Sequence, residues 1–335
     1  MSLRLSDKSV IKKVLLISLT NIGDVILTFP VIDILKKEFP SAKLSVVTGP
    51  KAEPLLRGNP YLHRVHIFDK HQSSFKLMGW IRELTRERFD LAVDLRNTAI
   101  PFMIFPRYRT SCFVRRENVM HMRDQHLQRL KSVYLYAPRT VEKCALFITK
   151  KDENYVDQLV EGQVGTPSRY IVIAPGAADQ AKRWPGCRVA SVCDQLIEKY
   201  NVKIVFAGGR DDAGVIGKIK EDMVKPSVNF CGRLTLTQLA ALFKGCRCAL
   251  VNDSAPMHLA SYLDVPVVAL FGPTDPRLYG PWSRRSYFLR NNQACPKCQH
   301  PKKSFQHICM NAITEREVLQ LFDRHASTLF SDHDV

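Results

Sequence analysis

Short apolar runs rich in β-branched residues alternate with longer amphipathic stretches along almost the whole chain. This alternation is typical of βα units, in which a buried parallel strand precedes a helix that covers the sheet. The first half contains amphipathic stretches at 26–39 and 75–88 that indicate helices, and Pro30 is expected to kink or restart the first of them. The strands expected in this half are 13–19, 43–48, 65–68 and 90–95.

The same alternation begins again in the second half of the chain. There the sequence Thr314-Glu315-Arg316-Glu317 has the form of a capping box and predicts the start of a last amphipathic helix over 314–330. The other helices expected in this half are 186–200, 212–224, 235–245 and 255–262. The strands expected are 170–174, 203–207, 248–252 and 266–271.

A segment without periodicity, 161–168, separates the two halves and predicts a linker. A chain of 335 residues is long enough for two domains, which we place at 1–164 and 165–335. The last helix, 314–330, is considered to pack back on the N-terminal domain. Two α/β halves joined by a linker imply a cleft between them. Ligands of open parallel sheets bind outside the carboxyl ends of the strands, so the loops at those ends are the candidate site.

The chain is strongly basic, with 49 Lys and Arg against 32 Asp and Glu and a formal net charge of +17. Such a charge attracts anionic partners, which include nucleic acid, membrane head groups and phosphorylated substrates. No apolar stretch approaches the roughly 18 residues of a membrane span, so a soluble intracellular protein is expected. The stretch 102–131 is densest in positive charge and is either a solvated face or a docking surface: Arg107, Arg109, Arg115, Arg116, Arg123, Arg129 and Lys131.

Ten cysteines in a chain without an export signal indicate reduced thiols. One group stands apart: Cys295 and Cys298 form a CxxC pair, and Cys309, His300 and His307 follow closely. Three Cys and a His are sufficient for a tetrahedral zinc site. Because no second CxxC matches the first, a structural loop of free thiols is the favoured interpretation, and no metal is assigned.

The loop after the first strand contains Gly23 and Asp24. Gly23 permits a tight turn, and Asp24 stands at the start of a helix. Asp24 is either the cap of that helix or a carboxylate that projects into the cleft and accepts a proton from a substrate hydroxyl.

Three loops of the second half contain candidate ligands for a nucleotide. The loop after 170–174 holds Lys182, whose point charge suits a phosphate. Asp211 follows the next strand and is either a ribose partner or a helix cap. The chain turns from strand to helix at Asp253 and Ser254, where backbone N–H groups bind a diphosphate well. His258 lies one turn into that helix and faces the same anion or is a satisfied core residue.

Several nucleotide-binding motifs are absent from the sequence. There is no GxGxxG after the first strand, which disfavours a dinucleotide oxidoreductase, and no GxxxxGK[ST], which disfavours a P-loop NTPase. No DxD arrangement is placed to hold a metal on a diphosphate, so no metal cofactor is expected. The phosphate charge is then balanced by Lys, a helix dipole and N–H donors.

Together the loops resemble those of glycosyltransferase family 9, the heptosyltransferases of lipopolysaccharide core assembly. The similar segments are VLLISLTNIGDVILTFP, PGAADQAKRWP and VNDSAPMHLASYLDVPVVALFGPTDP, in the family order and over nearly the whole chain. The resemblance implies an α/β protein of GT-B architecture, in which two Rossmann-like domains with parallel sheets face an interdomain cleft. The acceptor then belongs to the first domain and the donor, typically ADP-L-glycero-β-D-manno-heptose, to the second.

The resemblance also implies roles for individual residues. Asp24, next to Gly23, is similar to the catalytic base, and Lys182 to the residue that stabilises the leaving diphosphate. Asp211 corresponds to the ribose partner, and Leu234 to an apolar contact of the adenine. Ala177 and Ala178 stand where hydroxyl residues can occur, so contacts there are expected from the backbone alone. The diphosphate and donor-sugar loop is implied at Asp253, Ser254, Ala255 and His258, where Ala255 departs from the family's usual glycine.

The family is inverting, so attack opposite the ADP with Asp24 as base is expected. The acceptor is an anionic glycolipid, which implies a cytoplasmic protein peripherally associated with the inner membrane. The alternatives are a GT-B transferase that uses another nucleotide sugar, a related epimerase, or a non-catalytic nucleic-acid-binding protein. No reading motif for nucleic acid occurs, so nucleic acid is not an expected partner.

Overall fold

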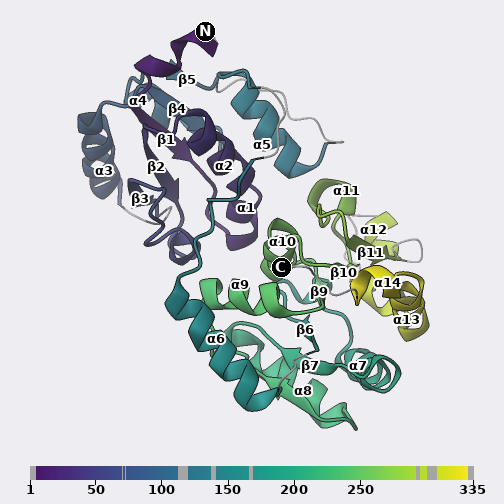
Figure 1. Ribbon diagram of the computed structural model, residues 1–335. Coiled ribbons are helices and arrows are strands. Elements are labelled where there is room, and N and C mark those ends of the chain that lie inside the picture. Colours follow the sequence, from purple (N-terminus) through teal and green to yellow (C-terminus); the bar gives the residue numbers. More distant parts are fainter. Residues whose placement is uncertain are drawn as a thin grey trace. The chain divides into compact units, whose positions relative to one another are not determined.

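The computed structural model describes residues 5–69, 71, 73–111, 120–136, 141–165, 169–291, 295–299 and 308–330. The chain divides into two compact units, Met1–Phe147 and Ile148–Val335. Each unit contains one parallel sheet with helices on both faces (Figure 1). This confirms the expected α/β class. That the two sheets face a cleft stays a prediction.

The N-terminal unit contains a five-stranded sheet with the order β3-β2-β1-β4-β5, and the pairings are all parallel. Its strands are β1 (Lys13–Ile17), β2 (Lys43–Thr48), β3 (Arg64–Ile67), β4 (Leu91–Asp94) and β5 (Tyr108–Arg109). Its α-helices are α1 (Ile22–Ile26), α2 (Phe29–Glu38), α3 (Ser74–Glu87), α4 (Ile100–Met103) and α5 (Met122–Lys131). Two 3-10 helices, η1 (Leu5–Val10) and η2 (Glu53–Leu55), complete it.

The side chains of β1 are buried on both faces of the sheet. Leu15 and Ile17 are fully buried and pack with Ile81 and Leu84 of α3, which covers one face. On the other face α2 packs against α5 (Figure 1). Pro30 stands in the first turn of α2, where its missing N–H costs nothing, and the first helix does restart there, as expected.

The C-terminal unit contains a six-stranded parallel sheet with the order β11-β10-β9-β6-β7-β8. Its strands are β6 (Tyr170–Ala174), β7 (Lys203–Phe206), β8 (Ser227–Asn229), β9 (Cys248–Asn252), β10 (Val267–Phe271) and β11 (Ser286–Arg290). Its α-helices are α6 (Lys150–Gln163), α7 (Gly186–Tyr200), α8 (Ala213–Asp222), α9 (Leu236–Gly245), α10 (Ala255–Tyr262), α11 (Pro276–Tyr279), α12 (Pro296–Gln299), α13 (Glu315–Arg324) and α14 (Ala326–Leu329). The 3-10 helices are η3 (Gln180–Lys182), η4 (Arg210–Asp212) and η5 (Met310–Ala312).

The division between the units lies at Phe147–Ile148 and not at 164–165, so the sequence-based boundary was wrong by one helix. Helix α6 belongs to the C-terminal unit because it packs against α9 through an apolar side that includes Val156 and Val160. Part of the expected linker, up to Gln163, is therefore the last turn of α6.

The expected last helix is two helices, α13 and α14, and both belong to the C-terminal unit. Val318 and Phe322 are fully buried in the core beneath α7, and the packing of this segment on the N-terminal domain stays a prediction. The capping box is confirmed. The Thr314 hydroxyl accepts from the N–H of Glu317 at 3.2 Å, and the Glu317 carboxylate accepts from the N–H of Thr314 at 2.8 Å. Among the described residues, no helix has both the length and the apolar character needed to cross a membrane.

Candidate active site

The loop after β1 presents Asp24 at the carboxyl edge of the N-terminal sheet. Asn21, with extended backbone, is the N-cap of α1, and Asp24 lies in the first turn. The interpretation of Asp24 as the helix cap is therefore wrong. The side-chain amide of Asn21 donates to Oδ2 of Asp24 at 3.0 Å, and Asp24 is partly exposed. A carboxylate oriented by a neighbouring amide and open to solvent is suited to accept a proton from a bound hydroxyl.

This loop is held rigidly against the sheet. The hydroxyls of Ser18 and Thr28 lie 2.8 Å apart, and both side chains are fully buried. At the end of β2, a Cβ on Gly49 would lie 2.7 Å from the Cα of Thr20, so only glycine permits this approach. Because the backbone around Gly23 is fixed by these contacts, Asp24 is positioned by packed structure and not by a mobile loop.

Arg96 is a candidate that the sequence analysis missed. It follows β4, and its guanidinium lies 4.6 Å from the ring centroid of Phe68, which follows β3. Since β1 and β2 lie between those strands, the side chain extends along the carboxyl edge where Asp24 also lies. Its Nη1 is buried and has no hydrogen-bond partner in the described part of the chain, and burial lowers the pKa of Arg96. A partly unsatisfied guanidinium is suited to a carboxylate or phosphate.

Lys182 and Asp253 meet at the carboxyl edge of the C-terminal sheet. Lys182 ends η3 after β6, and Asp253 follows β9 directly. Nζ of Lys182 lies 2.8 Å from Oδ2 of Asp253, whose side chain is only 5% exposed. Among the described residues, Lys182 is thus the cation that faces this buried oxygen. Lys182, at 29% exposure, keeps access to a ligand.

The start of α10 forms the floor next to this pair. Ser254 is the N-cap, but its hydroxyl donates to the carbonyl of Asn252 at 3.2 Å and caps no N–H. Ala255 and Ser254 are partly exposed, so their N–H groups remain close to the surface of the site. His258 is 5% exposed, and its ring stacks on Trp282 with centroids 5.6 Å apart. The structure therefore places His258 as a packed side chain beneath the loop.

Glycines and one carboxylate shape the neighbouring strand ends. Oδ2 of Asp212 accepts from the N–H of Gly209 at 2.9 Å, and a Cβ on Gly176 would lie 2.1 Å from Oδ1. The carboxylate that faces these strand ends is thus Asp212, which the sequence analysis did not assign. Asp211 is exposed in η4.

The remaining predicted contacts lie on the same side of the sheet. Gly232, at φ +70°, donates to the carbonyl of Gly208 at 3.0 Å, which brings the loop with the half-buried Leu234 to the end of β7. Ala177 is buried, and its carbonyl accepts from Nε of Arg183 at 2.7 Å, whereas Ala178 is exposed. The structure therefore gathers Lys182, Asp253 and Ser254 at one sheet edge, whereas Asp24 and Arg96 belong to the other unit.

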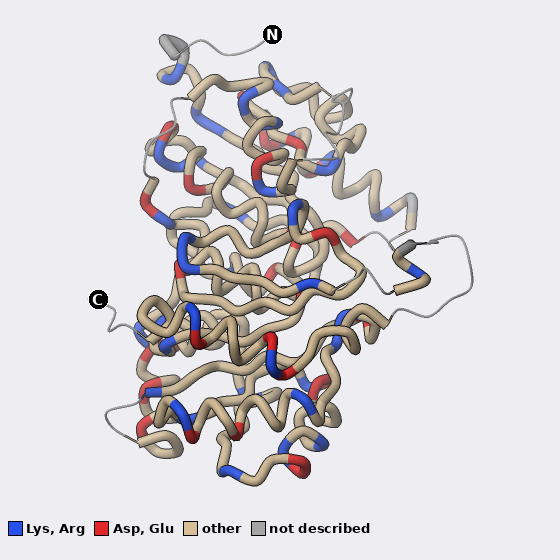
Figure 2. Tube along the Cα trace, turned by 90° about the vertical axis from the view of Figure 1, so that its right-hand side faces the viewer, with Lys and Arg blue, Asp and Glu red and all other residues tan. Residues whose placement is uncertain are grey.

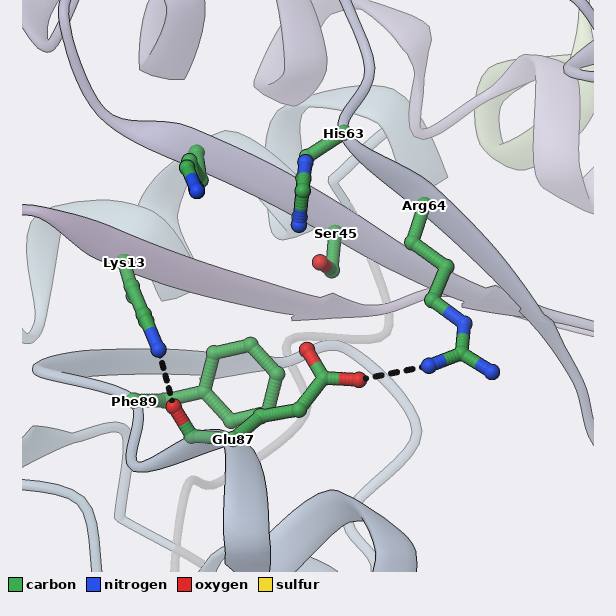
Figure 3. Close-up of a pocket in the computed structure, with 7 residues that line it drawn as sticks. Lys13, Ser45, His63, Arg64, Glu87 and Phe89 are labelled. Atoms are coloured by element: carbon green, nitrogen blue, oxygen red, sulfur yellow. Dashed lines mark hydrogen bonds and ion pairs between the residues drawn. The ribbon is translucent and has the colours of Figure 1, made fainter.

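A pocket of about 230 Å³ lies at the opposite, amino edge of the N-terminal sheet (Figure 3). It is lined by residues at strand starts, such as Lys13 and Arg64. Glu87 receives both cations, with its carbonyl 2.8 Å from Nζ of Lys13 and its carboxylate 3.2 Å from Nη1 of Arg64. Because the residues that line it stand at the amino ends of the strands, the pocket is separate from the edge that presents Asp24.

The two parallel α/β units, with charged loops at the carboxyl edges of their sheets, define the fold of the GT-B glycosyltransferases. Solved structures with this fold include a glycosyltransferase family 9 protein from Veillonella parvula, which has a TM-score of 0.78 and 23% identity over 95% of this chain and 97% of its own. The Escherichia coli ADP-heptose LPS heptosyltransferase II has a TM-score of 0.74 and 21% identity over 93% of this chain and 98% of its own.

A family model described as glycosyltransferase family 9 (heptosyltransferase) matches residues 116–309, more than half of the chain. A lipopolysaccharide heptosyltransferase 3 of Escherichia coli is 26% identical over 78% of this chain and 84% of its own length. A lipooligosaccharide heptosyltransferase 2 of Haemophilus ducreyi is 27% identical over 83% of this chain and 88% of its own length. The chain belongs to glycosyltransferase family 9, and it is a glycosyltransferase.

Proposed function

We propose that this protein transfers heptose from ADP-L-glycero-β-D-manno-heptose to the inner core of lipopolysaccharide, with inversion at the anomeric carbon. The observation that carries the proposal is the Lys182–Asp253 pair at the carboxyl edge of the C-terminal parallel sheet. Nucleotides bind at this edge in open parallel sheets. Family membership supports the proposal. So do the relatives named as lipopolysaccharide and lipooligosaccharide heptosyltransferases, which this chain matches over most of their length.

The donor is proposed to bind to the C-terminal unit. The diphosphate lies at Lys182 and at the N–H groups of Ser254 and Ala255, where a cation and a helix start both favour negative charge. Asp253 holds the ammonium of Lys182 at 2.8 Å, and the side chain of Lys182 is exposed enough to reach phosphate oxygens. The adenine contacts Leu234, and the ribose lies at η4 near Asp211.

The acceptor is proposed to bind to the N-terminal unit. Asp24 accepts the proton of the attacking hydroxyl, while the amide of Asn21 holds its carboxylate. Arg96 binds an acidic group of the acceptor, because its guanidinium lies along the same edge and has hydrogen-bonding capacity left.

Chemistry follows from these positions. The hydroxyl oxygen forms a bond to the anomeric carbon as the bond from that carbon to the β-phosphate oxygen breaks, and the electron pair leaves with ADP. The hydroxyl proton goes to Asp24. Lys182 stabilises the charge that develops on the departing diphosphate, which is the type of interaction that often contributes most to catalysis. No step requires a metal ion.

The protein is further proposed to act in the cytoplasm, in peripheral contact with the inner membrane. Arg107 and Arg109 lie beside rings in the basic stretch, with Arg109 4.4 Å from the centroid of Phe102. Phe105, next to them, is 78% exposed. Exposed aromatic and cationic side chains together suit the surface of an anionic membrane.

One member of the basic stretch does not contribute to that contact. Arg129 is buried and donates to the carbonyls of Asp94 and Ser111, so it has a structural role. Arg115 and Arg116 lie outside the described residues. Elsewhere, Lys and Arg occur along both units, interleaved with Asp and Glu (Figure 2).

Thermal shift against a panel of ADP-, GDP- and UDP-sugars tests the donor. We expect stabilisation by ADP-heptose and ADP and none by the other nucleotides at equal concentration. Stabilisation by a GDP- or UDP-sugar alone would replace the proposed donor and leave the assignment to the family intact.

A further inference from the structure

Three cysteine sulfurs gather in the segments that follow β11, the edge strand of the C-terminal sheet. The Sγ atoms of Cys295, Cys298 and Cys309 all lie within 4.8 Å of one another. Cys295 and Cys309 are 1% and 0% exposed, and Cys298 is partly exposed. The backbone N–H of Ile308 donates to the sulfur of Cys295 at 3.5 Å. Backbone donors of this kind stabilise thiolates, which are the form that binds metals.

The spacing of the sulfurs fits a shared ion better than a disulfide. The sulfurs of Cys298 and Cys309 are 3.1 Å apart, well beyond the roughly 2.05 Å of a disulfide bond. Thiolates at about 2.3 Å from one tetrahedral zinc lie roughly 3.8 Å apart. Cys295 and Cys298 belong to one turn, in which the N–H of Cys298 donates to the carbonyl of Cys295 at 3.1 Å. Small side-chain rotations therefore suffice to place all three sulfurs around one centre.

The charge around the three cysteines also suits a metal bound by thiolates. Three thiolates and a divalent ion have a net charge of −1, and the guanidinium of Arg290 opposes the effect of burial, which raises the pKa of the Cys298 thiol. Arg290 is held by the carbonyls of Gly272 and Pro273 at 3.4 and 3.3 Å, so this positive charge has a fixed position. A nearby cation lowers the free energy of an anionic thiolate centre.

The segment that follows Cys309 supports the loop that contains Lys182. The carbonyl of Ile313 accepts from the indole N–H of Trp184 at 3.0 Å. Met310 packs on Gly272, where a Cβ would lie 3.1 Å from its Cγ and 2.7 Å from the carbonyl of Ala181. Trp184, after Lys182, thus bonds to segment 309–313. Ala181, before Lys182, lies against Gly272, on which Met310 of that segment packs.

We propose that Cys295, Cys298 and Cys309 bind one thiolate-preferring transition-metal ion, zinc or iron, which holds segment 309–313 and through it the Lys182 loop. The role of the ion is structural, because Cys295 and Cys309 are fully buried and none of the three cysteines is among the proposed substrate contacts. The link to Lys182 rests on the proposed function, whereas the metal site does not. His300 and His307, considered as ligands from the sequence, lie outside the described residues, so the three thiolates carry the proposal.

Elemental analysis of the full chain, purified under reducing conditions without chelators, tests the site directly. We expect about one zinc or iron per chain, with X-ray absorption showing three sulfur ligands. Cys298→Ser should lower the metal content about tenfold or more. Cys298 is partly exposed, so this variant should fold, which circular dichroism checks. Cys187→Ser is the matched control, because Cys187 is exposed on α7 and should not affect the metal.

Hydrogen exchange tests the positioning role without an activity assay. Amides of 181–184 should exchange faster in Cys298→Ser than in the native chain, and Cys187→Ser, which lies outside this segment, should not change them. A native chain without zinc or iron, also after incubation with either ion under reducing conditions, would overturn the metal site. Bound metal in the native chain with unchanged exchange in Cys298→Ser would overturn the support of the Lys182 loop. Failure to bind any ADP-sugar would instead count against the proposed function alone.

Discussion

At the scale of single residues, the most informative contact is the one between Lys182 and Asp253. A buried carboxylate next to a partly exposed ammonium indicates a cation that is held in readiness for an anionic ligand. The pair lies where two strands end, which is where ligands of parallel sheets bind. The pair stabilises the folded loop, and we propose that it also recognises the diphosphate.

Replacing Lys182 with Ala is expected to lower turnover about 10²-fold or more, because the leaving diphosphate loses its cation. It should also lower the free energy of unfolding by about 1–3 kcal/mol, because Asp253 stays buried without a counter-ion. Steady-state kinetics and urea unfolding measure the two effects. In Lys182→Ala/Asp253→Asn, stability should recover while turnover does not. A near-normal rate in the single variant would exclude the leaving-group role.

Arg96→Gln is expected to raise the KM for the glycolipid acceptor about tenfold, because one charge-assisted contact is lost, while the affinity for the donor stays the same. Initial rates at varied acceptor concentration measure the change. Arg64→Gln is the control, since Arg64 pairs with Glu83 and Glu87 at the opposite edge of the same sheet. If both variants behave alike, Arg96 does not bind the acceptor.

Sequence reasoning located most of the candidate loops but not every side chain in them. Adjacent acids at 211 and 212 are indistinguishable by pattern, and only the close approach of Gly176 shows that Asp212 faces the strand ends. The stacking of His258 on Trp282 joins residues far apart in the chain, so no local signal predicts it. Arg96 follows a predicted strand end, and this position was the signal that would have identified it.

At the scale of secondary structure, long periodic elements were predicted well and short or half-exposed ones were not. Helices α7 and α10 match their expected ranges, because each has an apolar side that packs on a buried strand. Strand β5 has two residues and β8 three, too few for a periodic signal. β11 is only partly buried along its length, so its pattern is not that of a core strand. The missed helix α6, with few apolar positions, caused the error in the domain boundary.

The contact between β3 and α3 predicts a dependence of stability on pH. Burial lowers the pKa of His66 below its ordinary value, although Glu87, 3.3 Å away, opposes this. The unfolded chain therefore binds a proton more readily, and stability should fall as pH drops below about 6.5. Urea midpoints in this pH range should decline less steeply in His66→Gln than in the native chain. The exposed His63→Gln is the control, and equal slopes in all three proteins would contradict the prediction.

At the scale of the whole molecule, the proposed reaction uses the polar loops of both units. The N-terminal unit contributes a carboxylate and a guanidinium, and the C-terminal unit contributes a cation and a helix start. A net charge of +17 favours an acceptor and a membrane surface that are both anionic.

Binding to vesicles that contain anionic lipid should weaken as salt rises, because the Debye length shortens from about 10 Å at 0.1 M to about 3 Å at 1 M. Arg107→Gln/Arg109→Gln should weaken binding at low salt, as measured by vesicle sedimentation. Lys220→Gln, an exposed site in the C-terminal unit, should bind like the native chain. Binding that is insensitive to salt would count against an electrostatic contact.

The most direct test of the central claim is the transfer rate of Asp24→Ala, measured by mass spectrometry of the glycolipid product with calorimetry of donor binding alongside. The account predicts that transfer falls about 10²- to 10⁴-fold, because the attacking hydroxyl loses its base, while the donor Kd stays unchanged. Asp157→Ala, an exposed carboxylate on α6, should keep full activity. Transfer by Asp24→Ala at a rate near that of the native chain would contradict the claim that Asp24 removes the proton.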